Sequence, residues 1–176
     1  MPVRRDKRVE SYLTGVDQTQ FRVISLPPFR AASSGVDNVC DFSNDSILGK
    51  FDAYFSAIQV SDRDSFMPRD FLYYDEEKSG LVWAWALTED MDDGGNEVIS
   101  FDGGYYLTYV YVDGDDEMSG KRYKEAISYI ENSDVFELDI RPGHYIMGHI
   151  ITPSEIIKAQ GFAQMENFVP IKFKEK

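Results

Sequence analysis

The fold is decided by residues 97–132, which read EVISFDGGYYLTYVYVDGDDEMSGKRYKEAISYIEN. Glu97–Phe101 and Tyr105–Val112 are rich in aromatic and β-branched residues, which predicts two strands, and Gly103-Gly104 predicts the turn between them. Apolar residues recur at helical spacing in Asp116–Asn132, which predicts a helix. The residues expected on the inner face of this helix are Tyr123, Ala126, Ile127 and Ile130.

The same order of elements occurs nearer the N-terminus. Phe21–Leu26 and Phe29–Gly35 predict an extended segment that bends at Pro27-Pro28, because two prolines exclude a helix. Asn44–Val60 then predicts a helix, with its N-cap among the first three residues of this range. Its expected apolar face comprises Ile47, Phe51, Tyr54, Phe55 and Ile58.

A hairpin is expected after each helix. Asp70–Asp75 and Gly80–Leu87 predict the first hairpin, and Val135–Ile140 and His144–Ile151 predict the second, around Arg141-Pro142-Gly143. Ala163–Lys174 predicts a final strand.

The repeated order predicts an α+β fold in which two β-α-β-β units, at about residues 21–88 and 96–174, form one antiparallel sheet. Two helices are expected to cover one face of this sheet, and the other face, left free, is the expected groove for a ligand. The acidic, glycine-containing loop Glu89–Asn96 separates the units, and residues 1–20 are expected to form a flexible N-terminal arm.

Composition excludes several classes of protein. The net charge of −13 disfavours direct contact with nucleic acid, because binding to phosphates needs clustered positive charge. One cysteine, Cys40, makes no internal disulfide, and no apolar run approaches the roughly 20 residues that span a bilayer. The chain is therefore expected to be a cytoplasmic protein without membrane contact. No phosphate-binding motif occurs, and neither the acidic loops nor the two histidines have the spacing of a metal site, so we expect no cofactor and no metal.

Aromatic residues on the predicted strands suggest a binding surface. Trp83 and Trp85 alternate with Val82, Ala84 and Ala86, which favours small residues against a helix and tryptophans in the groove. Tyr106 and Tyr145 are placed at the groove by the same alternation, and Tyr54 of the first predicted helix joins these candidates. A surface of this kind binds flat or cationic molecules, although the rings would equally complete the core.

Glu166 lies in the largely apolar run Phe162–Lys172. A carboxylate inside an aromatic groove is costly unless a cation compensates it, which suggests a cationic ligand. The alternative is that Glu166 faces solvent on an edge strand.

Four segments together resemble the GyrI-like effector-binding domain, the small-molecule-binding module of many AraC- and MerR-type bacterial transcription regulators that also occurs alone. They are VISLPPFRAA (23–32), RDFLYYD (69–75), FDGGYYLTY (101–109) and MENFVPIK (165–172). The resemblance implies the duplicated fold with a ligand groove between its two halves. In the multidrug-binding members of this family, a buried glutamate of the last strand meets lipophilic cations amid aromatic rings. Glu166 matches that position, and Phe168 shares its face. The first 20 residues are too few for a DNA-binding domain, so we expect either a stand-alone member or a chain from which that domain was removed, and the short arm favours the former.

The leading hypothesis is a binding protein that senses or sequesters amphipathic, cationic compounds, acting with a regulator partner or as a homodimer. No catalytic residue is predicted. One alternative is a hydrolase of hydrophobic electrophiles with Glu166 as general base. Another is a gyrase-interacting inhibitor, which would act through its surface.

Overall fold

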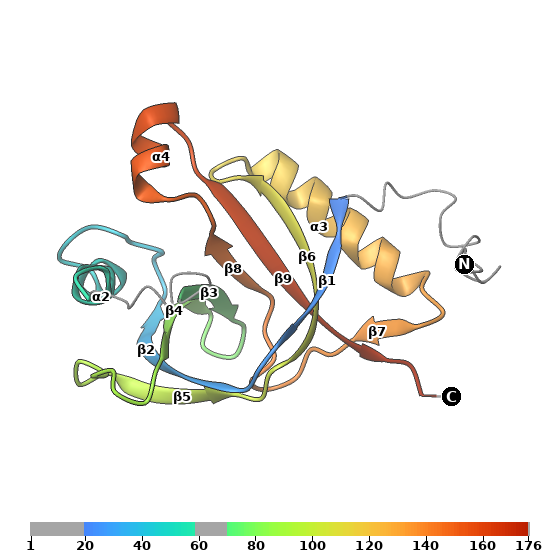
Figure 1. Ribbon diagram of the computed structural model, residues 1–176, viewed down its shortest axis with the longest axis horizontal. Coiled ribbons are helices and arrows are strands. Elements are labelled where there is room, and N and C mark those ends of the chain that lie inside the picture. The colour runs from blue at the N-terminus through green and yellow to red at the C-terminus, as the bar shows by residue number, and fades with distance from the viewer. Residues whose placement is uncertain (1–19, 59–69, 176) are drawn as a thin grey trace, which may run out of the picture.

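The computed structural model describes residues 20–58 and 70–175. These residues form one antiparallel sheet of nine strands with three helices, which confirms the predicted fold class (Figure 1). The strands are β1 (Arg22–Leu26), β2 (Phe29–Asp37), β3 (Asp70–Asp75), β4 (Gly80–Leu87), β5 (Glu97–Phe101), β6 (Gly104–Val112), β7 (Phe136–Leu138), β8 (Met147–Ile150) and β9 (Gln164–Phe173). The helices are α2 (Ile47–Ser56), α3 (Asp116–Glu131) and α4 (Ser154–Gln160).

The sheet has an internal pseudo-symmetry. Its strand order is β1-β6-β9-β8-β3-β4-β2-β5, with β7 pairing to β9 outside this path. Read from either edge, the sheet has the same sequence of equivalent strands: β1 corresponds to β5, β6 to β2, β9 to β4 and β8 to β3. The two halves therefore meet between β8 and β3, as expected for a duplicated unit.

Each half lends a strand to the other. The chain bends at Pro27-Pro28, so that β1 pairs with β6 in the second half while β2 pairs with β4 in the first. It bends again at Gly103, so that β5 pairs with β2 and β6 pairs with β9. The two bends touch, since a Cβ atom on Gly103 would lie 2.6 Å from backbone atoms of Leu26, Pro27 and Pro28.

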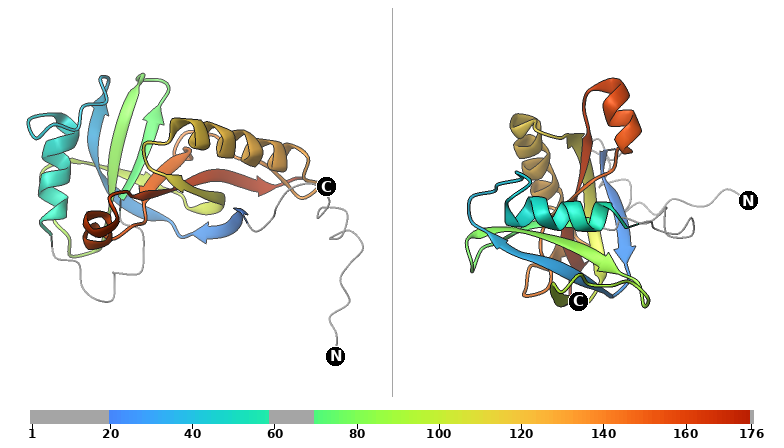
Figure 2. Two further views of the ribbon diagram at one scale, coloured as in Figure 1. Left: turned by 90° about the horizontal axis from the view of Figure 1, so that it is seen from above. Right: turned by 90° about the vertical axis from the view of Figure 1, so that its left-hand side faces the viewer.

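The helices α2 and α3 cover the outer face of the curled sheet, one for each half (Figure 2). Ser46 caps α2 by accepting a hydrogen bond from the Gly49 amide, and Asp115 caps α3 by accepting one from Met118. Under α3 the buried residues are Leu107, Tyr109, Ala126, Ile130, Val169 and Ile171. Under α2 they are Ala32, Phe51 and Phe55.

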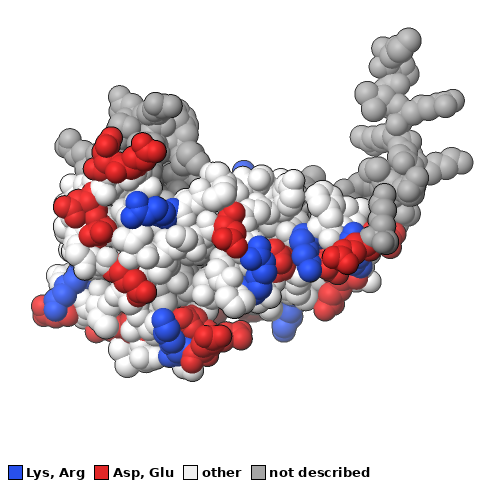
Figure 3. Space-filling view, turned by 90° about the horizontal axis from the view of Figure 1, so that it is seen from below, with Lys and Arg blue, Asp and Glu red and all other residues white. Residues whose placement is uncertain are grey.

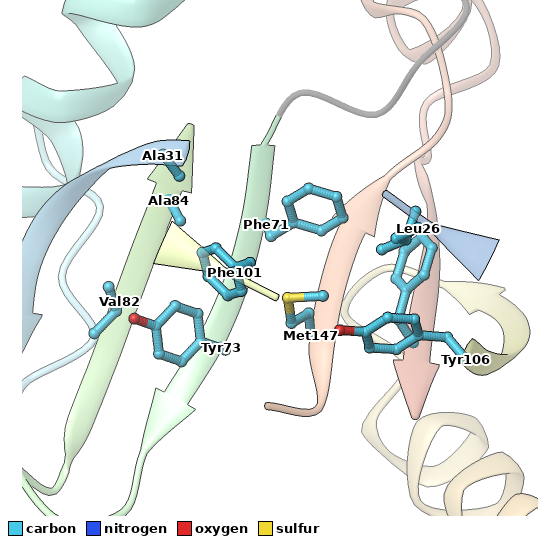
Figure 4. Packing of buried hydrophobic residues seen from close by; sticks show 10 residues of the cluster. Leu26, Ala31, Phe71, Tyr73, Val82, Ala84, Phe101, Tyr106 and Met147 are labelled. Atoms are coloured by element: carbon cyan, nitrogen blue, oxygen red, sulfur yellow. The ribbon is translucent and has the colours of Figure 1, made fainter. Parts of the chain in front are cut away.

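The inner face of the sheet carries a second apolar cluster, which contains residues of both halves. It includes Leu26, Phe71, Tyr73, Phe101, Tyr106 and Met147, and in Figure 4 the Phe71 ring points from β3 toward Leu26 while Tyr106 points toward Met147. We call this set, with Phe168, the inner-face cluster. Side chains from the two halves therefore pack against one another between the half-sheets.

Three local predictions were wrong. The second hairpin does not form, because β7 pairs with β9 and β8 pairs with β9 and β3, leaving a single bridge between Arg141 and His144. The short helix α4, which contains no buried residue, was not predicted. Tyr123 is 41% exposed, because the width of the apolar face of α3 is filled by Ala126 and Ile130.

Candidate ligand-binding site

The site begins with the alternation of side chains along β9. Val169 and Ile171 point outward and pack under α3, so Glu166 and Phe168 point to the inner face. Both are buried, with 5% of Glu166 and 1% of Phe168 exposed. The two residues that the resemblance placed on one face therefore do lie on one face.

Glu166 is surrounded by polar groups from three other strands. Its carboxylate forms an ion pair with Arg22 of β1 and lies opposite His149 of β8 in the strand register. The Nδ1 atom of His149 lies 3.0 Å from the Oδ1 atom of Asp70 and 3.0 Å from its backbone oxygen. We call Arg22, Asp70, His149 and Glu166 the Glu166 cluster.

The direction of the Arg22 side chain follows from the residue just before β1. Phe21 packs outward against Tyr129 of α3, with ring centroids 5.6 Å apart, so the next side chain points to the inner face. Arg22 stands opposite Thr108 of β6, the strand that separates β1 from β9. Neighbouring strands lie about 4.8 Å apart, so the arginine side chain extends across β6 to Glu166.

Aromatic rings adjoin the Glu166 cluster. The Phe71 ring centroid lies 6.2 Å from that of His149 and 5.6 Å from that of Phe168, the latter edge to face. Tyr106 continues this row, 6.4 Å from Phe168. A charge held by Glu166 would therefore have apolar ring surface on one side.

Two buried hydroxyl groups beside these rings are unpaired. The hydroxyl of Tyr106 and the Oγ1 atom of Thr108 have no hydrogen-bond partner within the described ranges, and both residues are at most 1% exposed. An unpaired buried polar group costs about 1–3 kcal/mol. Such groups on the inner face are available to a bound molecule.

Tyr145 lies beyond Met147 from Glu166, at the other end of the inner face. Its ring stacks on Tyr73 at a centroid distance of 4.3 Å and an angle of 12°. It lines a cleft of about 430 Å³ with Tyr74 and Arg141, and a cavity of about 210 Å³ with Asp75 and Glu97. Tyr106 and Tyr145 therefore both lie on the inner face, at some distance from each other along it, and their contact with a ligand stays a prediction.

The predicted placement of Trp83 and Trp85 in the groove is wrong. Both lie on the outer face, where Trp85 stacks on Phe55 of α2 at 5.4 Å and Trp83 packs against Phe51 at 6.3 Å. On the inner face of β4, Val82 and Ala84 stand opposite Tyr73 and Phe71 of β3, so small residues meet large rings there. The tryptophans between them point to the other face, where they pack with α2.

Tyr54 also lies away from the inner face. It is on α2, is 40% exposed, and its ring meets Phe55 edge to face at 4.9 Å. The helical spacing that led to this candidate is accounted for by Phe51 and Phe55, which pack α2 on the sheet.

Because Tyr106 is buried, the protein is expected to lose stability at alkaline pH. Burial raises the pKa of Tyr106 to about 12, and the nearby charge of Asp139 contributes. The unfolded chain releases this proton near pH 10, before the native protein does, so the stabilisation is complete below about pH 10 and is lost as the pH rises through the native pKa.

The free energy of unfolding in urea should fall from pH 9.5 to 11.5, and less steeply in Tyr106→Phe. Equal slopes would contradict the burial of the hydroxyl.

Charged side chains of both signs are mixed on the surface seen from below (Figure 3). On the face shown in Figure 3, basic side chains lie among acidic ones and form no patch of their own. Within residues 20–58 and 70–175, no three metal-binding side chains lie together, and no helix is long and apolar enough to cross a membrane.

Several site residues were missed by the sequence analysis. Arg22 is 144 positions from Glu166 in the chain, and nothing near it in the sequence indicates a buried partner. His149 was considered in the sequence analysis only as a metal ligand. Its pairing with Glu166 depends on the register between β8 and β9, which the sequence does not specify.

No protein-family model matches the sequence, and none of the curated proteins compared with it does. Several solved structures have a similar fold. The EcmrR C-terminal domain matches with a TM-score of 0.58 at 12% identity, over 87% of this chain and 97% of that chain. A hydrolase from Listeria innocua matches with 0.56 at 11% identity, over 94% and 98%. SAV2435 bound to tetraphenylphosphonium matches with 0.53 at 11% identity, over 87% and 94%.

At this level of identity the likeness concerns the fold. All three matches extend over nearly the whole of both chains, so the duplicated architecture is shared and not only one half of it. The chain therefore has the fold implied by its resemblance to the GyrI-like effector-binding domain.

Proposed function

We propose that this chain is a small-molecule-binding domain for amphipathic cations, and that Glu166 holds the positive charge of the ligand. The observation that carries the proposal is the burial of this carboxylate beside aromatic rings. Only 7% of the Glu166 side chain is exposed, and Phe168 and Phe71 lie next to it on the inner face.

Burial of this kind favours a cation over other ligands. A carboxylate removed from water needs a positive partner, and the attraction is stronger where water is excluded. Ring faces next to the carboxylate add a cation–π contribution, and the net charge of −13 concentrates cations near the protein.

The similar structures support this class of function. SAV2435, which shares the fold, is bound to tetraphenylphosphonium, an aromatic cation. The EcmrR structure is of a C-terminal domain, so the same fold occurs as part of a longer protein. We accordingly propose that the chain serves as a cytoplasmic sensor or sequestering protein, related to the effector-binding domains of transcription regulators, as a homodimer or with a regulator partner.

The test is a calorimetric titration with three compounds of similar shape. Tetraphenylphosphonium is expected to bind at micromolar concentration, tetraphenylborate to bind weakly or not at all, and triphenylphosphine oxide to fall between them. Glu166→Gln should weaken tetraphenylphosphonium binding by about 10- to 100-fold, since one charge-assisted contact is lost. Glu137→Gln is the matched control, because Glu137 pairs with Lys172 near the surface and not with the inner face.

Two results would contradict the proposal. Equal affinity for the cation and the borate would show that charge does not select the ligand. Unchanged affinity in Glu166→Gln would remove Glu166 from the site. Turnover distinguishes the alternative function, a hydrolase. The native protein would then hydrolyse a hydrophobic ester such as p-nitrophenyl butyrate, and Glu166→Gln would not.

A further inference from the structure

We infer that Arg22 is a built-in competitor of the cationic ligand, because its guanidinium occupies the place at Glu166 that the charge of the ligand takes. The inference rests on the proposed function and adds how the site is regulated. The ligand binds only when the ion pair opens, so a molecule must interact with Glu166 more favourably than Arg22 does in order to bind.

The two partners of this ion pair are buried to very different extents. The Arg22 side chain is 64% exposed, whereas the Glu166 side chain is 7% exposed. An exposed guanidinium regains most of its hydration when it leaves, so little is lost on the arginine side. Glu166, in contrast, remains buried and needs another positive partner. This asymmetry makes the arginine the group that is exchanged.

The position of Arg22 in the fold allows it to leave. It is the first residue of β1, an edge strand of five residues that pairs only with β6 among the described strands. Ile24 and Leu26 of the same strand pack into the inner-face cluster. The arginine side chain can therefore swing out while the rest of β1 stays anchored.

A hollow lies beside Arg22 at the β1 edge of the sheet. It has a volume of about 230 Å³ and is lined by Arg22, Thr108, Val110 and Arg122 among others. Val110 is the partner of Glu166 in the register of β6 and β9, so the hollow borders the Glu166 cluster. Thr108, whose buried Oγ1 atom has no hydrogen-bond partner in the described part of the chain, stands directly opposite Arg22. Movement of Arg22 would bring this unpaired hydroxyl into contact with the ligand.

The experiment compares tetraphenylphosphonium affinities of charge variants by calorimetry. Arg22→Met should bind the cation about tenfold more tightly than the native protein, because opening the ion pair lowers the affinity of the native protein by about that factor. Arg22→Lys should remain near the native affinity, since a competing positive charge is kept. Arg30→Met is the matched control: it removes the same charge from an exposed position on β2, outside the Glu166 cluster and the hollow, and should leave the affinity within about twofold.

A second measurement needs no change in the chain. The Nε–Hε signal of Arg22, assigned by its loss in Arg22→Lys, is followed by NMR while the native protein is saturated with tetraphenylphosphonium. We expect this signal to shift and to exchange faster with water as the ion pair opens. A signal that stays unchanged at saturation would overturn the inference, even if Arg22→Met proved unstable.

The outcomes separate this inference from the function on which it rests. Weaker binding in Glu166→Gln together with native affinity in Arg22→Met would leave the cation site intact and overturn the role of Arg22. Weaker binding in Arg22→Met would likewise overturn it, since Arg22 would then contact the ligand. Native affinity in both Glu166→Gln and Arg22→Met would overturn the proposed function itself.

Discussion

Replacing Phe168 with alanine is expected to lower the free energy of unfolding by about 3–5 kcal/mol, the usual cost of a large cavity in a packed core. The ring is 1% exposed and meets Phe71 from one half of the sheet and Tyr106 from the other, both edge to face. Its loss removes the contact that joins the half-sheets at the centre of the inner-face cluster. Urea unfolding followed by circular dichroism measures the effect.

Phe173 provides the control on the same strand. It is 58% exposed near the end of β9, although its ring touches Tyr105 and Phe136. Phe173→Ala should cost about 1 kcal/mol or less, because little apolar area leaves the protein interior. A cost for Phe168→Ala no larger than that for Phe173→Ala would mean that the inner face is not tightly packed.

The second large effect is expected at the crossing of the two bent strands. Gly103 has a φ of +74°, and a Cβ atom there would lie 2.6 Å from three backbone atoms of residues 26–28. Gly103→Ala combines backbone strain with a clash that no side-chain movement relieves. We expect a loss of about 3 kcal/mol or more in the free energy of unfolding, or failure to fold.

Gly95 separates the two contributions. Its φ is +76°, but a Cβ atom would meet nothing within 4 Å. Gly95→Ala therefore measures the strain alone, at about 1 kcal/mol. Similar losses for the two variants would show that the bends of β1–β2 and β5–β6 do not press against each other.

Much of this architecture follows from local sequence patterns. The helical spacing of apolar residues predicted both α2 and α3, and Ser46 is the predicted type of N-cap. Pro27-Pro28 marked the bend between β1 and β2. These features were accessible because each depends on residues close together in the chain. The pairing of β7 with β9 was not, since Val135–Ile140 and His144–Ile151 have all the local marks of a hairpin.

The site could be predicted only in part, for a related reason. Glu166 was conspicuous because a charge stands in an apolar run, and its burial agrees with that interpretation. The faces of Trp83 and Trp85 were misassigned, because alternation shows which residues share a face but not which face a helix covers. Arg22 was missed because its partner is brought to it by the tertiary fold alone.

The exchange of strands between the halves has a consequence for how the chain folds. When the first half has left the ribosome, β1 has no partner, since its neighbour β6 begins only at Gly104. The β2 strand likewise lacks β5 on one side until Phe101 has been made. Neither repeat can complete its own hydrogen bonds, so the two repeats must fold as one unit. Contacts so distant in sequence slow folding, and the first repeat should wait, incompletely formed, for the second.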